Sequence, residues 1–235
     1  MKKKMTTIAL ACMLFGASAA QAIPLLQLDI SDGVYDSVTE TIVSASDEFT
    51  LYALLTPGNH GDVAALLDDT YYISAAITPQ VGEPGADLGS FSFNGDTVNA
   101  TGDMTYGTPP SELVDNNVDL PSHGIFPTYF SEFSFQFLEG QVTETYNAQD
   151  NPGGWTGIGD GTYYVAFDVD KTLLDPRFQV HFDLYSKNDD NTINKFAPFS
   201  HDAQSSPVPE PATMLLFGTG LAGLVGTRVR RKKKA

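Results

Sequence analysis

The sequence is short of thiols. Of its 235 residues only one is a cysteine, Cys12, and it lies in the apolar stretch at the start of the chain. If that stretch is removed, the mature protein has no thiol. Disulfide frameworks, thiolate zinc sites and cysteine nucleophiles are then excluded together.

The sequence also has few cations outside its two ends. Its 13 basic residues stand against 29 acidic ones, and nine of the 13 lie at the two ends. Residues 23–209 carry 28 of the 29 acidic residues, all except Glu210, and only four cations, which gives a net charge of −24; the four are Lys171, Arg177, Lys187 and Lys195. Because binding to phosphates needs clustered Lys and Arg, this part of the chain binds neither nucleic acid nor anionic lipid.

Common catalytic motifs are missing as well. There is no His-Glu-x-x-His, no Gly-x-Ser-x-Gly and no Gly-Lys-Ser/Thr. The glycine-rich run 157–161 precedes a strand pattern and has no lysine nearby, which indicates a loop. The histidines are widely separated without ligand spacing and are interpreted as surface residues; they are His60, His123, His181 and His201. We predict no catalytic residue and no metal ligand.

The first 22 residues have the pattern of a secretory signal. Three lysines are followed by a short, small and apolar run, and then by Ala20-Gln21-Ala22. This order matches the positive, apolar and Ala-x-Ala regions of a cleaved signal peptide. We expect export through the Sec machinery and cleavage after Ala22.

The last residues have the pattern of a membrane segment. Residues 212–227 are sixteen uncharged residues, and a basic tail follows at once, made of Arg228, Arg230, Arg231, Lys232, Lys233 and Lys234. A helix of that length spans ~24 Å, and the basic side chains can extend to make up the thickness of the bilayer. Since cations stay on the cytoplasmic side, the acidic part of the chain lies on the exported side.

Three C-terminal elements carry a family resemblance. Pro209, Glu210 and Pro211, the short apolar helix and the basic tail occur in this order at residues 208–235. Together they resemble the PEP-CTERM sorting signal. The resemblance implies processing by exosortase, a membrane protease of Gram-negative bacteria that make extracellular polysaccharide.

Between these ends the hydrophobic pattern has period two. Five segments alternate apolar and polar residues, so each is expected to have one buried and one wet face; they are 49–55, 71–77, 132–137, 163–169 and 178–184. Asn94-Gly95 between two such runs predicts a tight hairpin. We predict an all-β single domain over 23–199, an antiparallel β-sandwich or jelly roll, with a helical turn near 62–68 and a linker over 200–207.

This predicted domain has a resemblance of its own. Leu26–Ile30, Gly33–Asp36 and Thr39–Val43 near its start, and Phe182–Tyr185 and Phe196–Asp202 near its end, resemble a choice-of-anchor domain of the group labelled N. The resemblance implies a surface protein without a settled activity.

Two kinds of ligand stay open for the domain. Oxygen ligands for Ca²⁺ are offered by 187–192 and by Asp96 with Asp103, although neither follows the calcium-loop pattern. A sugar-stacking surface is offered by aromatic residues, namely Trp155, Tyr71, Tyr72, Tyr163 and Tyr164. Paired carboxylates for glycan hydrolysis are the third option.

The sequence therefore predicts an exported, acidic, non-enzymatic protein without a cofactor. Its expected partners are exosortase and the Sec machinery during export, and exopolysaccharide afterwards. It is expected at the cell surface or outside a Gram-negative cell after a transient stay at the inner membrane. The alternatives are a carbohydrate- or calcium-binding surface module and a glycan hydrolase.

Overall fold

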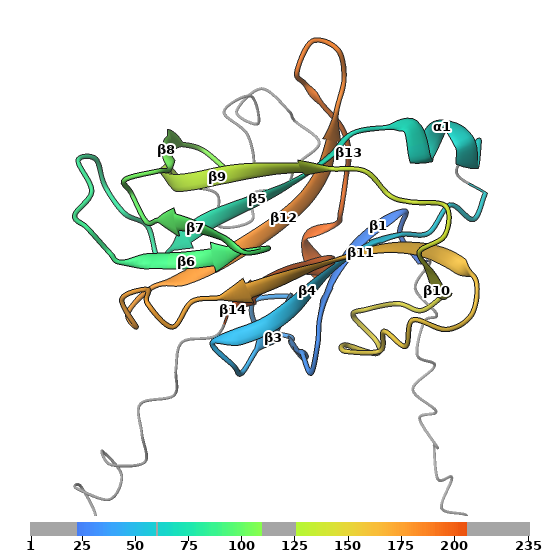
Figure 1. The fold of residues 1–235 in the computed structure, drawn as a ribbon, viewed down its shortest axis with the longest axis horizontal. Helices are drawn as coiled ribbons and strands as arrows, with labels where there is room; N and C mark the ends of the chain where they lie inside the picture. The colour runs from blue at the N-terminus through green and yellow to red at the C-terminus, as the bar shows by residue number, and fades with distance from the viewer. Residues whose placement is uncertain (1–22, 60, 110–125, 206–235) are drawn as a thin grey trace, which may run out of the picture.

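The computed structural model describes residues 23–59, 61–109 and 126–205 (Figure 1). The predicted signal cleavage site, the Pro-Glu-Pro motif, the apolar helix and the basic tail lie outside these residues, as do His60 and His123. In the part of the chain that is described, no helix is long and apolar enough to cross a membrane.

One sheet is entirely antiparallel. Its strands run in the order β1 (Leu26–Ile30), β4 (Glu48–Leu55), β11 (Gly161–Asp170), β6 (Ser90–Phe93) and β7 (Asp96–Asn99), and β10 (Val142–Glu144) pairs with β11. The register between β4 and β11 is unbroken from Glu48 opposite Asp170 to Leu55 opposite Tyr163. We call this the first sheet.

The second sheet contains a parallel pair. Its order is β2 (Val34–Asp36), β3 (Thr41–Ser44), β14 (Asp202–Ser205), β12 (Gln179–Lys187), β5 (Tyr71–Thr78), β9 (Thr128–Phe135) and β8 (Thr105–Gly107), and β13 (Ile193–Phe196) pairs with β12. Strand β14 runs parallel to β3, beside which it lies in Figure 1. With two sheets and little helix, the prediction of an all-β sandwich is confirmed. The prediction that its strands are all antiparallel is wrong for β3 and β14.

Aromatic rings join the two sheets. Phe93 of the first sheet stacks on Phe133 of the second at 4.2 Å between ring centroids. Phe135 meets Phe167 edge to face at 5.1 Å, and Phe49 meets Phe182 at 6.2 Å. Such pairs add stability beyond the area that they bury. The alternation predicted for 132–137 is confirmed, because its three phenylalanines face the core while Gln136 is exposed.

Two local predictions are confirmed. Asn94 and Gly95 both have positive φ, 51° and 89°, and they join β6 to β7 as the two-residue hairpin requires. The predicted helical turn is α1 (Val63–Asp68), and the Asp62 side chain accepts a hydrogen bond from the Ala64 N–H at its start.

The prediction that every alternating segment has a wet face is wrong for β4, β5 and β12. These strands are buried on both faces over most of their length. On the first sheet, Trp155 stacks on Tyr52 of β4 at 4.6 Å. On the second sheet, the short 3-10 helix η2 (Phe199–His201) and Phe126 lie over the outer face of β12 and β5. Irregular segments therefore cover the strand faces that the alternating pattern alone would assign to solvent.

The structure also corrects the predicted linker over 200–207. Its described residues, 200–205, continue η2 and then form β14, where Ala203 and Ser205 are fully buried. The Ser205 hydroxyl accepts a hydrogen bond from the Val180 N–H at 2.9 Å. A run of small polar residues is typical of a linker. Here the same small side chains allow the segment to fit between β3 and β12.

Truncating an aromatic ring of the core tests how strongly the two sheets are joined. Phe93 is 2% exposed and contacts three other rings, so Phe93→Ala should lower the free energy of unfolding by ~3–5 kcal/mol. Ser92→Ala, on the other face of the same strand, should cost less than ~1 kcal/mol. Urea unfolding of both variants measures this, and equal losses would contradict the assignment of the two faces.

Candidate functional site

A histidine and two aspartates meet on the outer face of the second sheet. His181 and Asp183 lie two residues apart on β12 and so share a face. Phe182 between them points into the core, where it meets Phe49. Strand β14 pairs with β12 so that Gln204 lies opposite His181, and Asp202 begins that strand.

The ligating atoms of this cluster are close together. His181 Nε2 lies 3.5 Å from Asp183 Oδ1 and 3.8 Å from Asp202 Oδ2. One nitrogen and two carboxylate oxygens all lie within 4.8 Å of one another. Among residues 23–59, 61–109 and 126–205, no other group of three such side chains meets that condition. We call these three residues the His-Asp-Asp cluster.

Both carboxylates of the cluster are buried. Asp202 is 1% exposed and Asp183 is 8% exposed. Burial, and after it the charge of Asp183, raises the pKa of Asp202 well above the usual range for an aspartate. Asp202 Oδ2 has no hydrogen-bond partner among the described residues. The cluster therefore holds a carboxylate that is stable only when a proton or a cation neutralises it.

Glutamine side chains orient the imidazole. Gln204 Nε2 donates a hydrogen bond to Gln179 Oε1, which turns Gln204 Oε1 toward His181 Nδ1 at 3.2 Å. Nε2 then faces the two carboxylates. Burial opposes the charged ring, but the charge of Asp183 and the hydrogen bonds of the ring to Asp183 and Gln204 together outweigh burial and raise the pKa of His181.

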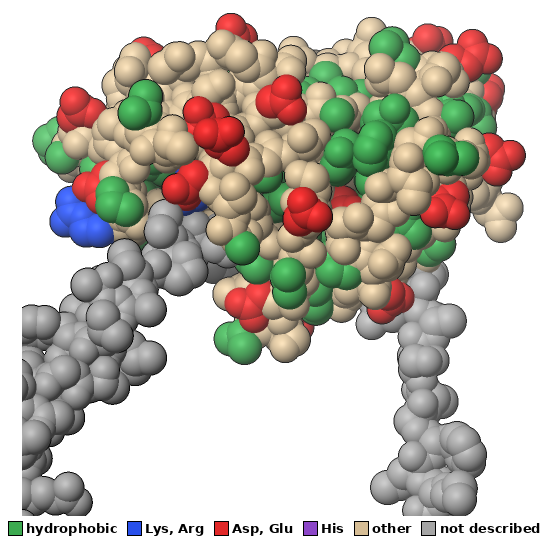
Figure 2. Space-filling model, turned by 60° about the horizontal axis from the view of Figure 1, so that its bottom comes forward, with side chains coloured by type: hydrophobic (Ala, Val, Ile, Leu, Met, Phe, Trp, Pro, Cys, Tyr) green, Lys and Arg blue, Asp and Glu red, His purple; other side chains and the backbone are tan. Residues whose placement is uncertain are grey.

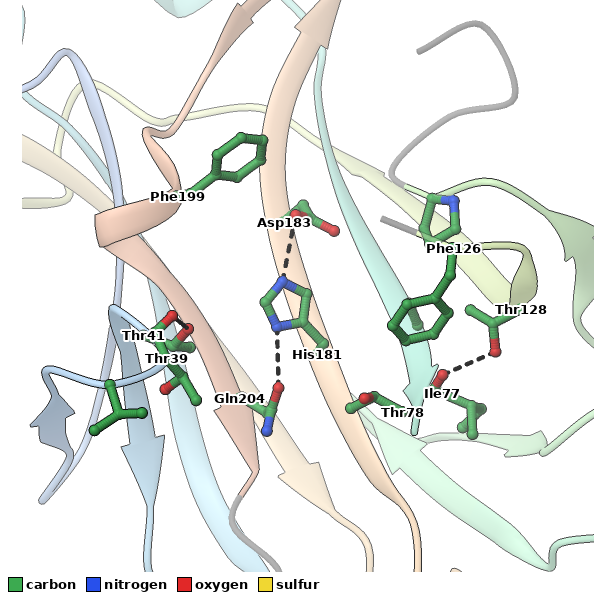
Figure 3. Close-up of a pocket in the computed structure, with 13 residues that line it drawn as sticks. Thr39, Thr41, Ile77, Thr78, Phe126, Thr128, His181, Asp183, Phe199 and Gln204 are labelled. Carbon is green, nitrogen blue, oxygen red and sulfur yellow. Dashed lines mark hydrogen bonds and ion pairs between the residues drawn. The ribbon is translucent and has the colours of Figure 1, made fainter. Parts of the chain in front are cut away.

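The cluster lies at one wall of a pocket of about 380 Å³. Figure 3 shows His181 between Asp183 and Gln204, with Phe199 and Phe126 on either side of the pocket. Thr128 lies across from the histidine, and its hydroxyl donates to the Ile77 carbonyl at 2.9 Å. The pocket thus gives a small molecule or a water access to His181 and Asp183, while Asp202 is buried beside them.

The interpretation of the histidines as surface residues is wrong for the two that are described. His181 is half-buried within the cluster. His201 is 3% exposed, its Nε2 lies 3.0 Å from Asn147 Oδ1, and burial lowers its pKa to about 4. The His-x-Asp spacing on a predicted strand indicated that the side chains of His181 and Asp183 share one face of the sheet. No spacing indicated Asp202, which reaches β12 only through the pairing of β14.

A second polar cluster links β1 of the first sheet to residues 146–153. The Asp29 carboxylate accepts hydrogen bonds from the Tyr146 hydroxyl at 2.6 Å and from the Gly153 N–H at 2.8 Å. Gln27 accepts from the Ala148 N–H at 2.9 Å. Burial raises the pKa of Asp29, while these donors lower it. This cluster binds residues 146–153 to β1, and its donors are all used within the protein.

The two calcium candidates from the sequence are used locally. Asp103 Oδ2 accepts from the Asn99 backbone N–H and from its side-chain amide, and Asp190 Oδ1 accepts from the Thr192 N–H and hydroxyl. Asp96 lies at the start of β7. The Asp103 and Asp190 carboxylates thus stabilise local turns.

The aromatic candidates do not form one surface. Tyr71 is fully buried and Tyr72 stacks on Tyr185 at 5.8 Å, both on the second sheet. Trp155 packs on Tyr52 and meets Tyr164 edge to face, on the first sheet. Tyr163 is the neighbour of Tyr164 on β11, in the first sheet. The five rings predicted as a sugar platform are thus divided between two sheets.

The second polar cluster gives a stability prediction. Asp29→Ala leaves the Gly153 N–H and the Tyr146 hydroxyl buried without an acceptor and should cost about 2–5 kcal/mol in unfolding free energy. Asp29→Asn keeps an oxygen for Gly153 and should cost less than half as much. Thermal and urea unfolding compare the two, and an equal loss would show that the carboxylate charge, not its acceptor role, holds the segment.

Comparison with known proteins concerns the end of the chain. Residues 207–232 match the PEP-CTERM protein-sorting motif, a range that includes Pro209–Pro211 and the basic residues as far as Lys232. No curated protein matches the sequence. The matched motif starts two residues after β14 ends at Ser205. The chain therefore carries a PEP-CTERM motif that marks it as an exported protein, anchored transiently in the membrane and sorted through exosortase.

Proposed function

We propose that this protein is a non-enzymatic, acidic component of the cell surface or extracellular matrix of a Gram-negative bacterium. In this proposal exosortase removes the C-terminal signal, and the folded domain associates with exopolysaccharide. One observation carries the proposal: all the strands that the structure describes lie between the two predicted targeting segments.

The boundaries of the fold support delivery of an intact domain. The first strand, β1, begins at Leu26, after the predicted cleavage site at Ala22. The last strand, β14, ends at Ser205, before the matched motif begins at 207. Loss of both targeting segments removes none of the strands described for the two sheets. The two sheets can therefore act outside the cell without the membrane segment.

The charge distribution supports a role in an aqueous, polymer-rich space. All four cations of the domain are ion-paired, namely Lys171 with Asp47, Arg177 with Asp175, Lys187 with Glu132 and Lys195 with Asp69. Acidic side chains are spread over the face shown in Figure 2, while Lys and Arg gather toward one side of that view. A surface with this charge stays soluble and repels anionic lipid.

The non-enzymatic part of the proposal rests on the absence of catalytic motifs from the sequence. A carbohydrate-binding module has less support than a matrix component, because the aromatic candidates are divided between the sheets and one face of Trp155 lies against Tyr52. A glycan hydrolase would need a carboxylate pair across an open cleft. The His-Asp-Asp cluster instead places its carboxylates 3.5 and 3.8 Å from the same histidine nitrogen, on a sheet face.

Processing and location test the proposal in the native host. Intact-mass analysis of extracellular protein should give a chain that starts at Ile23 and ends near Pro209–Pro211. Fractionation should find this chain with the extracellular polysaccharide. A triple variant, Pro209→Ala, Glu210→Ala and Pro211→Ala, should stay full-length in the membrane fraction.

Two results would contradict it. Surface material that still ends at Ala235 would indicate a permanent anchor. Processed chain found only in the medium, with none in the polysaccharide fraction, would contradict the association with exopolysaccharide.

A further inference from the structure

We propose that the His-Asp-Asp cluster is a binding site for one divalent transition-metal ion of the zinc class. The site consists of His181 Nε2, an oxygen of Asp183 and Oδ2 of Asp202, on paired strands β12 and β14. It is separate from the sorting motif, and the function proposed above does not depend on it.

Asp202 is the first reason. It is 1% exposed, and its Oδ2 has no hydrogen-bond partner within the described part of the chain, although it lies 3.8 Å from His181 Nε2. An ionised carboxylate buried in this way is strongly unfavourable unless a positive charge compensates it. Every Lys and Arg of the domain is paired with another acid, so none of them provides that charge.

The distances within the cluster are the second reason. Zinc bonds to imidazole nitrogen and carboxylate oxygen are about 2.0–2.2 Å long. In a tetrahedron with such bonds, neighbouring ligand atoms are separated by roughly 3.4 Å. The separations from His181 Nε2, 3.5 Å to Asp183 and 3.8 Å to Asp202, are close to that value. All three ligating atoms lie within 4.8 Å of one another.

The surroundings of His181 are the third reason. Metal-bound histidines usually have a second partner that fixes the ring by a hydrogen bond to the other nitrogen. Gln204 Oε1 is such a partner at His181 Nδ1, and Gln179 in turn orients Gln204. The arrangement therefore presents Nε2 to the two carboxylates before any ion arrives.

The donor set selects the class of metal. Imidazole nitrogen suits Zn²⁺ and its neighbours in the first transition row, whereas Ca²⁺ takes six to eight oxygen ligands. The cluster offers one nitrogen and two carboxylates, and two of the three residues line the pocket. The pocket provides room for a water or a small ligand in a fourth position.

A titration tests the proposal on the purified secreted protein after treatment with a chelator. Calorimetry with Zn²⁺ should give one equivalent per chain, and Ca²⁺ should bind at least about 10-fold more weakly. Co²⁺ in place of Zn²⁺ should give the intense visible absorption of a tetrahedral site, which surface carboxylates do not produce.

Three variants locate the site. His181→Gln and Asp183→Asn should each abolish the Co²⁺ absorption and weaken Zn²⁺ binding by more than about 10-fold. Gln204→Ala should keep the absorption and weaken binding by about 10-fold, because it removes only the partner of the ring. Unfolding curves without metal check that each variant is folded.

The matched control removes two carboxylates from the other sheet. Glu48 and Asp168 line a separate pocket there with Asp170. The double variant Glu48→Gln and Asp168→Asn should bind Zn²⁺ as tightly as the parent. The proposal is overturned if the parent binds no stoichiometric Zn²⁺, if Ca²⁺ binds as tightly as Zn²⁺, or if control and cluster variants lose affinity equally.

Discussion

The shortage of cations constrains every buried acid in this protein. With four Lys and Arg side chains, all ion-paired, the domain has to satisfy its buried carboxylates by other means. For Asp29 it uses backbone N–H groups and a tyrosine hydroxyl, which are strong donors to a carboxylate. Together with the hydrogen bonds of Gln27, these contacts hold residues 146–153 against β1.

Asp202 is the contrasting case. Its carboxylate is as deeply buried as that of Asp29, but its nearest polar neighbours are a histidine and a second aspartate. A neighbouring carboxylate cannot stabilise its charge, and the histidine is shared between the two. The two acids thus show two different outcomes of the same constraint, a closed network at β1 and an electrostatically incomplete cluster at β14.

The sequence was sufficient to predict what depends on neighbours along the chain. The hairpin at Asn94-Gly95, the turn of helix after Asp62 and the inward phenylalanines of 132–137 follow from local backbone and side-chain preferences. What depends on long-range pairing was not predicted. Strand β14 pairs in parallel with β3, from the other end of the domain, and its short polar sequence has no strand pattern.

The same limit applies to the candidate site. His181 and Asp183 have the spacing of one strand face, which a period-two pattern reveals. Asp202 joins them only because β14 inserts between β3 and β12, so the cluster depends on a topology that no local rule encodes. The outer faces of β4 and β5 were assigned to solvent for a related reason. The segments that cover them are irregular, so no hydrophobic periodicity in the sequence reveals them.

The place where β14 ends also limits where the processing enzyme can work. Ser205 is held in the sheet by its hydrogen bond to Val180, and Pro209 follows four residues later. Four fully extended residues reach at most ~14 Å. A protease that cuts at the Pro-Glu-Pro motif therefore works within about that distance of the folded domain. Its active site has to reach a motif that no long spacer separates from the end of β14.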